Sequence, residues 1–131
     1  MITIDISSRR QVEMIDVTSQ VRHAIRETGI QSGLATIFTP HTTAAITINE
    51  NADPDVVSDL VMEINKIVPL HDNYRHLEGN SAAHLKSSLV GASETVIIQN
   101  GEMLLGCWQG LYFCEFDGPR SRKLHIQVLG T

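Results

Sequence analysis

The chain has 131 residues, of which 42% are hydrophobic, so it is long and apolar enough to bury one core, and we expect a single domain over residues 1–131. Its formal net charge of −5 argues against nucleic acid and anionic membranes as partners, because both are bound by basic surfaces. No stretch approaches the length of a membrane span and the first residues lack the pattern of a signal peptide, so we expect a cytoplasmic protein.

The chain opens with two strand-like segments. Ile2, Ile4 and Ile6 alternate with polar residues, which is typical of a strand with one buried face. A polar turn at residues 7–10 separates this segment from a second one at residues 12–17. Because only a short turn joins them, we expect the two strands to pair with each other.

A short helix is expected next. Thr18 or Ser19 would cap its start, the helix would continue to about Thr28, and Gly29 would end it. Three apolar residues fall on its inward face: Val21, Ala24 and Ile25.

Two further strands follow this helix. Residues 33–38 and 45–48 have β character, and Pro40 breaks the run between them. The break leaves His41 and its two threonine neighbours in the connection between two strands.

Asp53 and Pro54 mark the start of a longer helix. Asp53 suits the N-cap, and Pro54 suits the first helical position, where its missing N–H costs nothing. Pro69 closes the element. Apolar residues recur between these limits at helical spacing: Val57, Leu60, Val61, Ile64 and Ile67.

The segment from His71 to Lys86 holds three of the six histidines of the chain around a Gly-Asn pair. Asn80 suits the N-cap of a helix that continues to Leu89. His84 then lies in the first turn or just after it, where the helix dipole disfavours the imidazolium. We expect a neutral His84 that can accept a proton or bind a metal. The alternative is a histidine that caps or packs at a loop–helix junction.

The last part of the chain is expected to be strand. Asn100-Gly101 predicts a two-residue turn between strands at residues 94–99 and 102–105, because a type I′ turn needs positive φ at both positions. Residues 107–116 are apolar on both faces, as in a strand that is covered on both sides or that meets another subunit. A basic loop then precedes a final strand with inward Leu124, Ile126 and Val128.

These elements predict an α+β fold with about seven to nine strands, mainly in antiparallel, sandwich-like sheets, and about three helices. Cys107 and Cys114 would point to opposite faces of a strand, which makes a disulfide between them difficult. We therefore expect free, buried thiols.

Three histidines are candidate metal ligands. His41, His76 and His84 supply three imidazole nitrogens, a set that suits zinc with one position left for water or substrate. They come from separate elements, so no short spacing identifies the site. His71 could replace one ligand, although its place before a turn favours a solvated loop residue, and His125 is expected to point outward from the last strand.

Four carboxylates are candidates for acid–base chemistry: Glu50, Asp53, Glu78 and Asp117. Asp53 is explained by helix capping, and Glu78 could be an ordinary loop carboxylate. Glu50 has no comparable local role, so it is the better candidate for a general base or for the partner of a ligating histidine. Glu50 and His84 are therefore the candidate catalytic residues.

Four more residues are candidates for substrate binding. Arg120 lies in the basic loop 117–123 and could present its guanidinium fork to a phosphate, although most basic loops are simply solvated. Asn49, Trp108 and Gln109 belong to polar segments that could line a site, although Trp is more often a core residue. A small phosphate or diphosphate is therefore the expected ligand.

Several separated blocks carry a resemblance to a known family. They are His41-Thr-Thr-Ala-Ala-Ile-Thr-Ile-Asn-Glu-Asn51 with Asp53-Pro54, Tyr74-Arg-His76-Leu-Glu-Gly79, Ala83-His84-Leu-Lys-Ser-Ser88, Gly106-Cys-Trp-Gln109 and Glu115-Phe-Asp-Gly-Pro-Arg120. In this order they resemble the YjbQ-like family, also described as secondary thiamine-phosphate synthases. Cys107 stands where the family usually has Thr, an exchange of one small residue for another.

The resemblance implies a compact α+β fold, a homotrimer, and clustered histidines at a site near the subunit boundary. It also implies the joining of a pyrimidine-methyl diphosphate to a thiazole phosphate, with loss of pyrophosphate. Zinc at the histidines is the first expected cofactor, and magnesium could accompany a diphosphate substrate.

Our first hypothesis is a metal-dependent, phosphate-handling transferase with thiamine-phosphate synthase activity. A metal-dependent hydrolase that uses the same histidines is the alternative enzyme. The non-enzymatic alternative is a trimeric protein that binds a small molecule and in which the histidines are structural.

Overall fold

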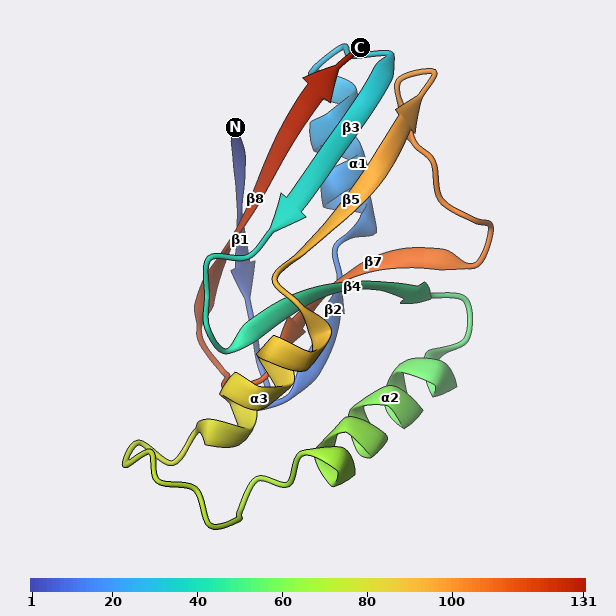
Figure 1. The fold of residues 1–131 in the computed structure, drawn as a ribbon. Coiled ribbons are helices and arrows are strands. Elements are labelled where there is room, and N and C mark those ends of the chain that lie inside the picture. The colour runs from blue at the N-terminus through green and yellow to red at the C-terminus, as the bar shows by residue number, and fades with distance from the viewer.

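The computed structural model describes residues 1–131 as eight strands and three helices, and it confirms the α+β class (Figure 1). The strands are β1 (Ile2–Ser7), β2 (Glu13–Asp16), β3 (Ser32–Phe38), β4 (Ala44–Glu50), β5 (Ser93–Gln99), β6 (Glu102–Met103), β7 (Gln109–Glu115) and β8 (Ser121–Gly130). The helices are α1 (Thr18–Glu27), α2 (Pro54–Ile67) and α3 (Ser81–Val90).

The strands form two antiparallel sheets. Sheet A has five strands in the order β1-β8-β3-β5-β6, and sheet B has three strands in the order β2-β7-β4. Figure 1 shows the long strands of sheet A rising through the upper half of the molecule, while β4 and β7 of sheet B cross below them.

The main core lies between the two sheets and α1. Sheet A contributes Ile37 and Ile126, sheet B contributes Ile46 and Phe113, and α1 contributes Ile25, all of them fully buried. A smaller core on the other side of sheet B packs under α3. Sheet B is therefore covered on both faces, which explains why the sequence of β7 is apolar on both.

The prediction that the first two strands pair with each other is wrong. β1 pairs with β8 in sheet A, where Ile4 lies opposite Leu124. β2 pairs with β7 in sheet B, where Ile15 lies opposite Phe113. The intervening turn carries the chain from one sheet to the other. Alternation along a segment indicates a strand, but it carries no information about the partner strand.

The hairpin and the state of the cysteines are confirmed in most respects. Asn100 and Gly101 have φ values of 54° and 78°, as the predicted two-residue turn requires. Both cysteines are free, and Cys114 is buried. Cys107 is exposed, contrary to our expectation, because β7 begins only at Gln109.

Side-chain caps were predicted at the starts of all three helices, but only α2 has one. Asp53 caps α2 as predicted and accepts a hydrogen bond from the backbone N–H of Asp55 at 2.9 Å. Neither Thr18 nor Asn80 uses its side chain as a cap. The Nδ2 of Asn80 instead donates to Oδ2 of Asp117 at 2.9 Å, so a tertiary contact replaces the expected local one.

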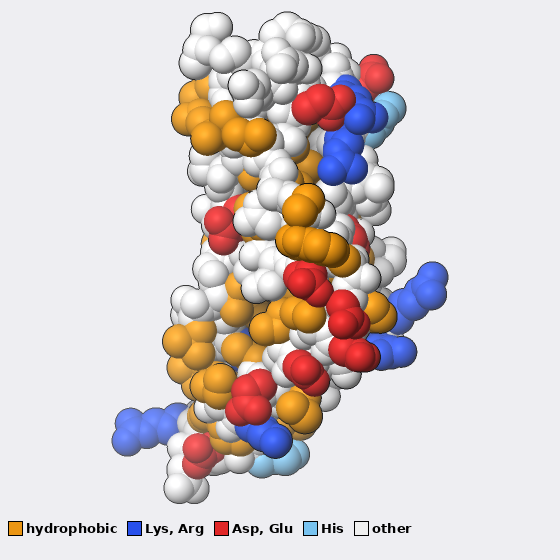
Figure 2. Space-filling model, turned by 90° about the vertical axis from the view of Figure 1, so that its right-hand side faces the viewer, with side chains coloured by type: hydrophobic (Ala, Val, Ile, Leu, Met, Phe, Trp, Pro, Cys, Tyr) orange, Lys and Arg blue, Asp and Glu red, His pale blue; other side chains and the backbone are white.

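Helix α2 lies against sheet B without burying any residue completely. Its apolar side chains are only partly covered, with Leu60 37% and Ile67 64% exposed. Figure 2 shows hydrophobic and acidic side chains next to each other on the side of the molecule where α2 lies. None of the three helices has the length and hydrophobicity needed to span a bilayer.

Candidate functional site

A polar cleft of about 440 Å³ opens where three connections meet: the β3–β4 loop, the segment before α3, and the β7–β8 loop. Pro40 aside, every one of its 11 lining residues is polar or charged: His41, Thr42, Thr43, His76, Glu78, Asn80, His84, Asp117, Arg120 and Arg122. The cleft therefore brings together the three predicted histidines and Arg120, which are far apart in the sequence.

His76 and His84 form a pair within this cleft. Their ring centroids are 5.5 Å apart and the rings are nearly perpendicular, at 82°. His84 lies in the first turn of α3, where the expected helix start places it, and its backbone N–H donates to the carbonyl of Asn80 at 3.3 Å. The Nε2 of His76 is 3.8 Å from a carboxylate oxygen of Glu78.

His41 lies in the β3–β4 loop and is held by a backbone contact. Its Nε2 accepts a hydrogen bond from the backbone N–H of Lys123 at 2.8 Å. Burial lowers the pKa of His41, the charge of Arg122 lowers it further, and Glu115 opposes this only in part. A neutral imidazole that accepts at Nε2 carries its proton on Nδ1. His41 is therefore a hydrogen-bond donor through Nδ1 at neutral pH.

Arg120 is positioned by the carboxylate that precedes it in the loop. Its Nη2 donates to Oδ2 of Asp117 at 3.0 Å, and its Nε donates to the backbone carbonyl of Asp117 at 2.9 Å. The remaining guanidinium N–H groups have no partner within the chain, and the side chain is 50% exposed. Arg120 can therefore present them to an anion in the cleft.

A buried ion pair lies beneath the cleft. Glu115 is fully buried and Arg122 is 3% exposed, and Nη2 of Arg122 donates to Oε2 of Glu115 at 2.5 Å. Arg122 also donates to Oγ1 of Thr43 at 2.8 Å, and Ser8 Oγ donates to Oε1 of Glu115 at 2.6 Å. This network joins the β3–β4 loop to β7 and β8, and it holds the floor of the cleft.

The hydrogen bonds of this network set the protonation state of Glu115. Burial alone would raise the pKa of Glu115. Hydrogen bonds from Arg122, Ser8 and the backbone N–H of Asp117 lower it, as does the positive charge of Arg122, and these effects together outweigh burial. The net result is a lowered pKa, so Glu115 is ionised at neutral pH.

Sequence reasoning missed the burial of Arg122, because it placed this residue in the basic loop 117–123. Arg122 is in fact part of β8, on the same face as Leu124 and Ile126. Its two-residue spacing from these inward residues was a usable signal, because alternate residues of a strand share a face. A charge in that register is unusual enough to suggest a buried partner.

The predicted three-histidine metal site is not assembled within one chain. No group of three histidine, cysteine or acidic side chains lies close enough together to hold a shared ion. His76 and His84 form a pair, whereas the Nε2 lone pair of His41 already accepts from Lys123. A metal at this cleft would therefore be held by His76 and His84, with further ligands from elsewhere.

Four other predicted site residues lie at the opposite end of sheet B. Glu50 and Gln109 pair with each other at the far ends of β4 and β7, with Asn49 and Trp108 beside them. β4 has seven residues and starts next to the cleft at Ala44, so at about 3.4 Å per residue it separates Glu50 from the histidines by roughly 20 Å. One chain does not bring these residues to the cleft.

The chain is similar to known proteins both in sequence and in fold. A family model described as UPF0047 protein YjbQ-like matches residues 2–131. The UPF0047 protein YugU of Bacillus subtilis is 55% identical to this chain, and the match covers 98% of each protein. A UPF0047 protein of Methanocaldococcus jannaschii is 50% identical over 95% of this chain and 91% of its own length.

A solved structure from Clostridium acetobutylicum has the same fold. It is described as an uncharacterized conserved protein of the yjbq/upf0047 family, and it is 48% identical to this chain. The TM-score is 0.97, with 98% of this chain and all of the other covered. The similarity thus extends over both sheets and all three helices.

Proposed function

Since the chain belongs to the UPF0047 YjbQ-like family, we propose that it is a phosphate-handling transferase of the thiamine-phosphate synthase type. The substrates would be a pyrimidine-methyl diphosphate and a thiazole phosphate. The observation that carries this proposal is the cleft, in which three imidazoles and the free N–H groups of Arg120 converge and no hydrophobic side chain except that of Pro40 takes part.

The donors of the cleft suit the negative charge that the reaction produces. The C–O bond between the pyrimidine methylene and the diphosphate breaks, the ring nitrogen of the thiazole forms a C–N bond to that methylene, and pyrophosphate leaves with the bonding electron pair. Arg120 and the Nδ1–H of His41 would donate to the oxygens of the leaving group. His84, next to His76, would supply a further donor or transfer a proton.

A divalent metal belongs to this proposal as a cofactor that would add positive charge at the diphosphate. Zinc is the first candidate and magnesium the second. We expect about one equivalent of zinc in purified, untagged protein, reduced in His76→Ala and His84→Ala but retained in His41→Ala, since Nε2 of His41 is already engaged. Plasma mass spectrometry measures this directly.

The exposed His23→Ala variant is the matched control for the metal measurement, because His23 lies on α1, outside the residues that line the cleft. Equal metal content in all four variants and the parent would remove the histidine pair as a metal site. The histidines would then remain direct phosphate donors.

The homotrimer is the second part of the proposal, and an apolar row on sheet A supports it. Leu34 lies opposite Ile97 on β5 and opposite Leu129 on β8, so the three side chains form one row across three strands. They are 46%, 54% and 67% exposed. An exposed apolar row of this kind is a suitable subunit contact.

We expect a solution mass of three chains of 14.5 kDa each by light scattering, and smaller species for Leu34→Asp. In this assembly we propose that Glu50, with Asn49, Trp108 and Gln109, completes the cleft of a neighbouring chain. Glu50→Gln and His84→Ala should then each be inactive alone, whereas refolding them together should restore part of the turnover, because some clefts receive both intact residues.

Full activity of Glu50→Gln by itself would remove Glu50 from the mechanism. If the two variants stay inactive after joint refolding, Glu50 and His84 would have to act in the site of the same chain. That outcome would contradict their separation of roughly 20 Å along β4. Refolding of parent protein through the same procedure controls for the recovery of activity.

A further inference from the structure

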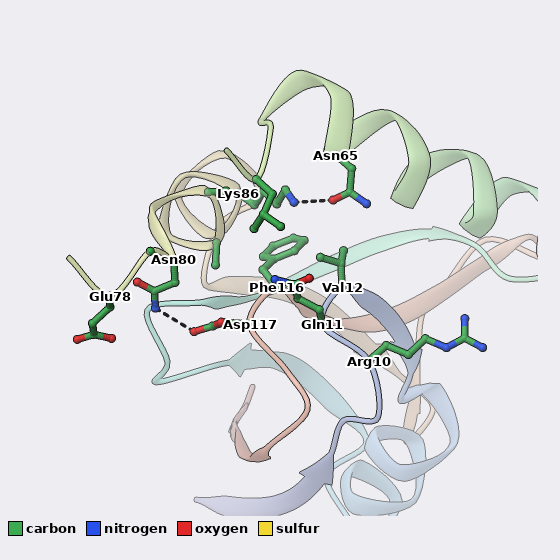
Figure 3. A pocket seen from close by; sticks show the side chains of 13 residues that line it. Arg10, Gln11, Val12, Asn65, Glu78, Asn80, Lys86, Phe116 and Asp117 are labelled. Carbon is green, nitrogen blue, oxygen red and sulfur yellow. Dashed lines mark hydrogen bonds between the residues drawn. The ribbon is translucent and has the colours of Figure 1, made fainter. Parts of the chain in front are cut away.

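A second cavity, of about 580 Å³, lies next to the cleft (Figure 3). It is enclosed by α2, α3, the segment before β2 and the end of β7. Glu78, Asn80 and Asp117 line both the cavity and the cleft, so these three residues form the partition between them. None of the site residues predicted from the sequence lies in the rest of the cavity.

Lys86 of α3 is a buried cation in this cavity, with an exposed fraction of 2%. Its Nζ donates to Oδ1 of Asn65 on α2 at 2.5 Å, as Figure 3 shows, and that neutral amide is its only partner. No carboxylate forms an ion pair with it. The buried Arg122, in contrast, is neutralised by Glu115. A buried charge without a counter-charge is unfavourable, so an anion bound beside Lys86 would be strongly favoured.

Asn80 adds a second unmatched polar group at the partition. Its Nδ2 donates to Asp117, while its Oδ1 is buried and has no hydrogen-bond partner. A buried acceptor without a donor lowers stability, and a ligand N–H or O–H would satisfy it. Asp117 is already engaged by Asn80 and Arg120, so it does not neutralise Lys86.

The remaining wall of the cavity is partly apolar. The ring of Phe116 lies at its centre in Figure 3, next to Val12, and Ala83 of α3 lines it as well. Phe116 and Ala83 belong to the smaller core under α3. A flat or aliphatic body of a ligand can pack against these side chains while its charged end reaches Lys86.

We propose that this cavity is a second small-molecule site, which binds an organic anion with an apolar body and one hydrogen-bond donor. The anionic group pairs with Lys86, the donor reaches Oδ1 of Asn80, and the body packs on Phe116. This site is distinct from the phosphate donors of the cleft and does not depend on the transferase proposal. Its position behind the shared partition places its ligand next to whatever the cleft binds.

The test uses 4-hydroxybenzoate as the probe and the full-length protein labelled with nitrogen-15. We expect saturable shifts of the backbone amide signals of Ala83 and Phe116 on titration, and no such shifts with benzyl alcohol, which has a similar body but no charge. Lys86→Met should weaken binding by about tenfold or more, since it removes a charged hydrogen bond. Lys66→Met, an exposed lysine in the last turn of α2, should bind like the parent.

Thermal denaturation separates this role from a purely structural one. If Lys86 serves to bind an anion, its charge is unpaired in the ligand-free protein. Ligand-free Lys86→Met should then melt at the same temperature as the ligand-free parent or at a higher one, because an unpaired buried charge is removed. A lower melting temperature, together with the absence of probe binding to the parent, would overturn the proposal and leave Lys86 as a link between α2 and α3. Equal responses to benzyl alcohol and 4-hydroxybenzoate would also overturn it, and this comparison needs no variant.

Inorganic phosphate distinguishes the cavity from the cleft. His84→Ala should keep its response to 4-hydroxybenzoate and lose its response to phosphate. If the parent binds 4-hydroxybenzoate but not phosphate, the function proposed for the cleft fails and the cavity site stands. Loss of both responses in His84→Ala would show that the two spaces are one site and would overturn the proposal of a separate cavity.

Discussion

Glu115→Gln is expected to lower the free energy of unfolding by about 3–5 kcal/mol, the usual cost of removing one partner of a buried ion pair. The variant removes the charge that balances Arg122, which is only 3% exposed. The glutamine also cannot accept all the hydrogen bonds that Glu115 takes from Arg122, Ser8 and Asp117. Urea unfolding followed by circular dichroism measures the change at neutral pH.

The double variant Glu115→Leu with Arg122→Met is the matched control. Replacing both charges by apolar groups is often neutral or stabilising, so the double variant should be more stable than Glu115→Gln. A double variant that is as unstable as the single one would mean that packing around these side chains, and not the unpaired charge, is responsible.

Acid provides a second check on the same pair. Because the pKa of Glu115 is lower in the folded chain than its ordinary value of 4.5, its ionisation stabilises the fold above about pH 4.5. That contribution is lost as the pH falls from 4.5 through the lowered pKa of the folded state. The stability difference between the parent and Glu115→Gln should therefore shrink over this range.

His84→Ala is expected to reduce kcat/KM for the joining reaction by about 10²–10⁴, the usual contribution of a proton-transferring or donor side chain. His84 is partly exposed in the first turn of α3, so its loss should leave the fold intact. Mass spectrometry of the product formed from the pyrimidine diphosphate and the thiazole phosphate measures turnover. The exposed His23→Ala variant should keep the parent's activity.

The products also distinguish the three hypotheses for function. Release of pyrophosphate without the joined product would indicate a hydrolase that uses the same cleft. No turnover of either kind by the parent, with loss of the trimer in His84→Ala, would indicate a structural or binding role for the histidines. His84→Gln adds a further distinction, because it keeps a hydrogen-bond donor but cannot transfer a proton.

Much of the local structure could be predicted because its causes are local. The alternation of Ile2, Ile4 and Ile6 indicates a strand whatever lies opposite, and Asn100-Gly101 requires a tight turn wherever the hairpin packs. Asp53 and Pro54 likewise begin α2 through groups within one turn of each other. The chemistry of the side chains likewise made His41, His76 and His84 candidate metal ligands and Arg120 a candidate phosphate ligand.

Residue pairings across the molecule could not be predicted in the same way. β1 and β2 belong to different sheets, because strand partners are chosen by the packing of the two sheets and not by the turn between the strands. The side chain of Asn80 does not cap α3 but donates to Asp117, which is 37 residues further along the chain. In both cases a contact distant in sequence decided the outcome.

The sequence by itself determined the secondary structure, the fold class and most of the candidate functional side chains of the cleft. Only the tertiary structure decided that Arg122 is buried against Glu115, that Glu50 lies roughly 20 Å from the histidines, and that Lys86 lines a cavity without forming an ion pair. The physical reason is that burial and charge pairing depend on residues brought together by the packing of β7, β8, α2 and α3. Hydrophobic periodicity and helix capping, in contrast, depend on residues that are close together in the sequence, so they can be recognised in the sequence itself.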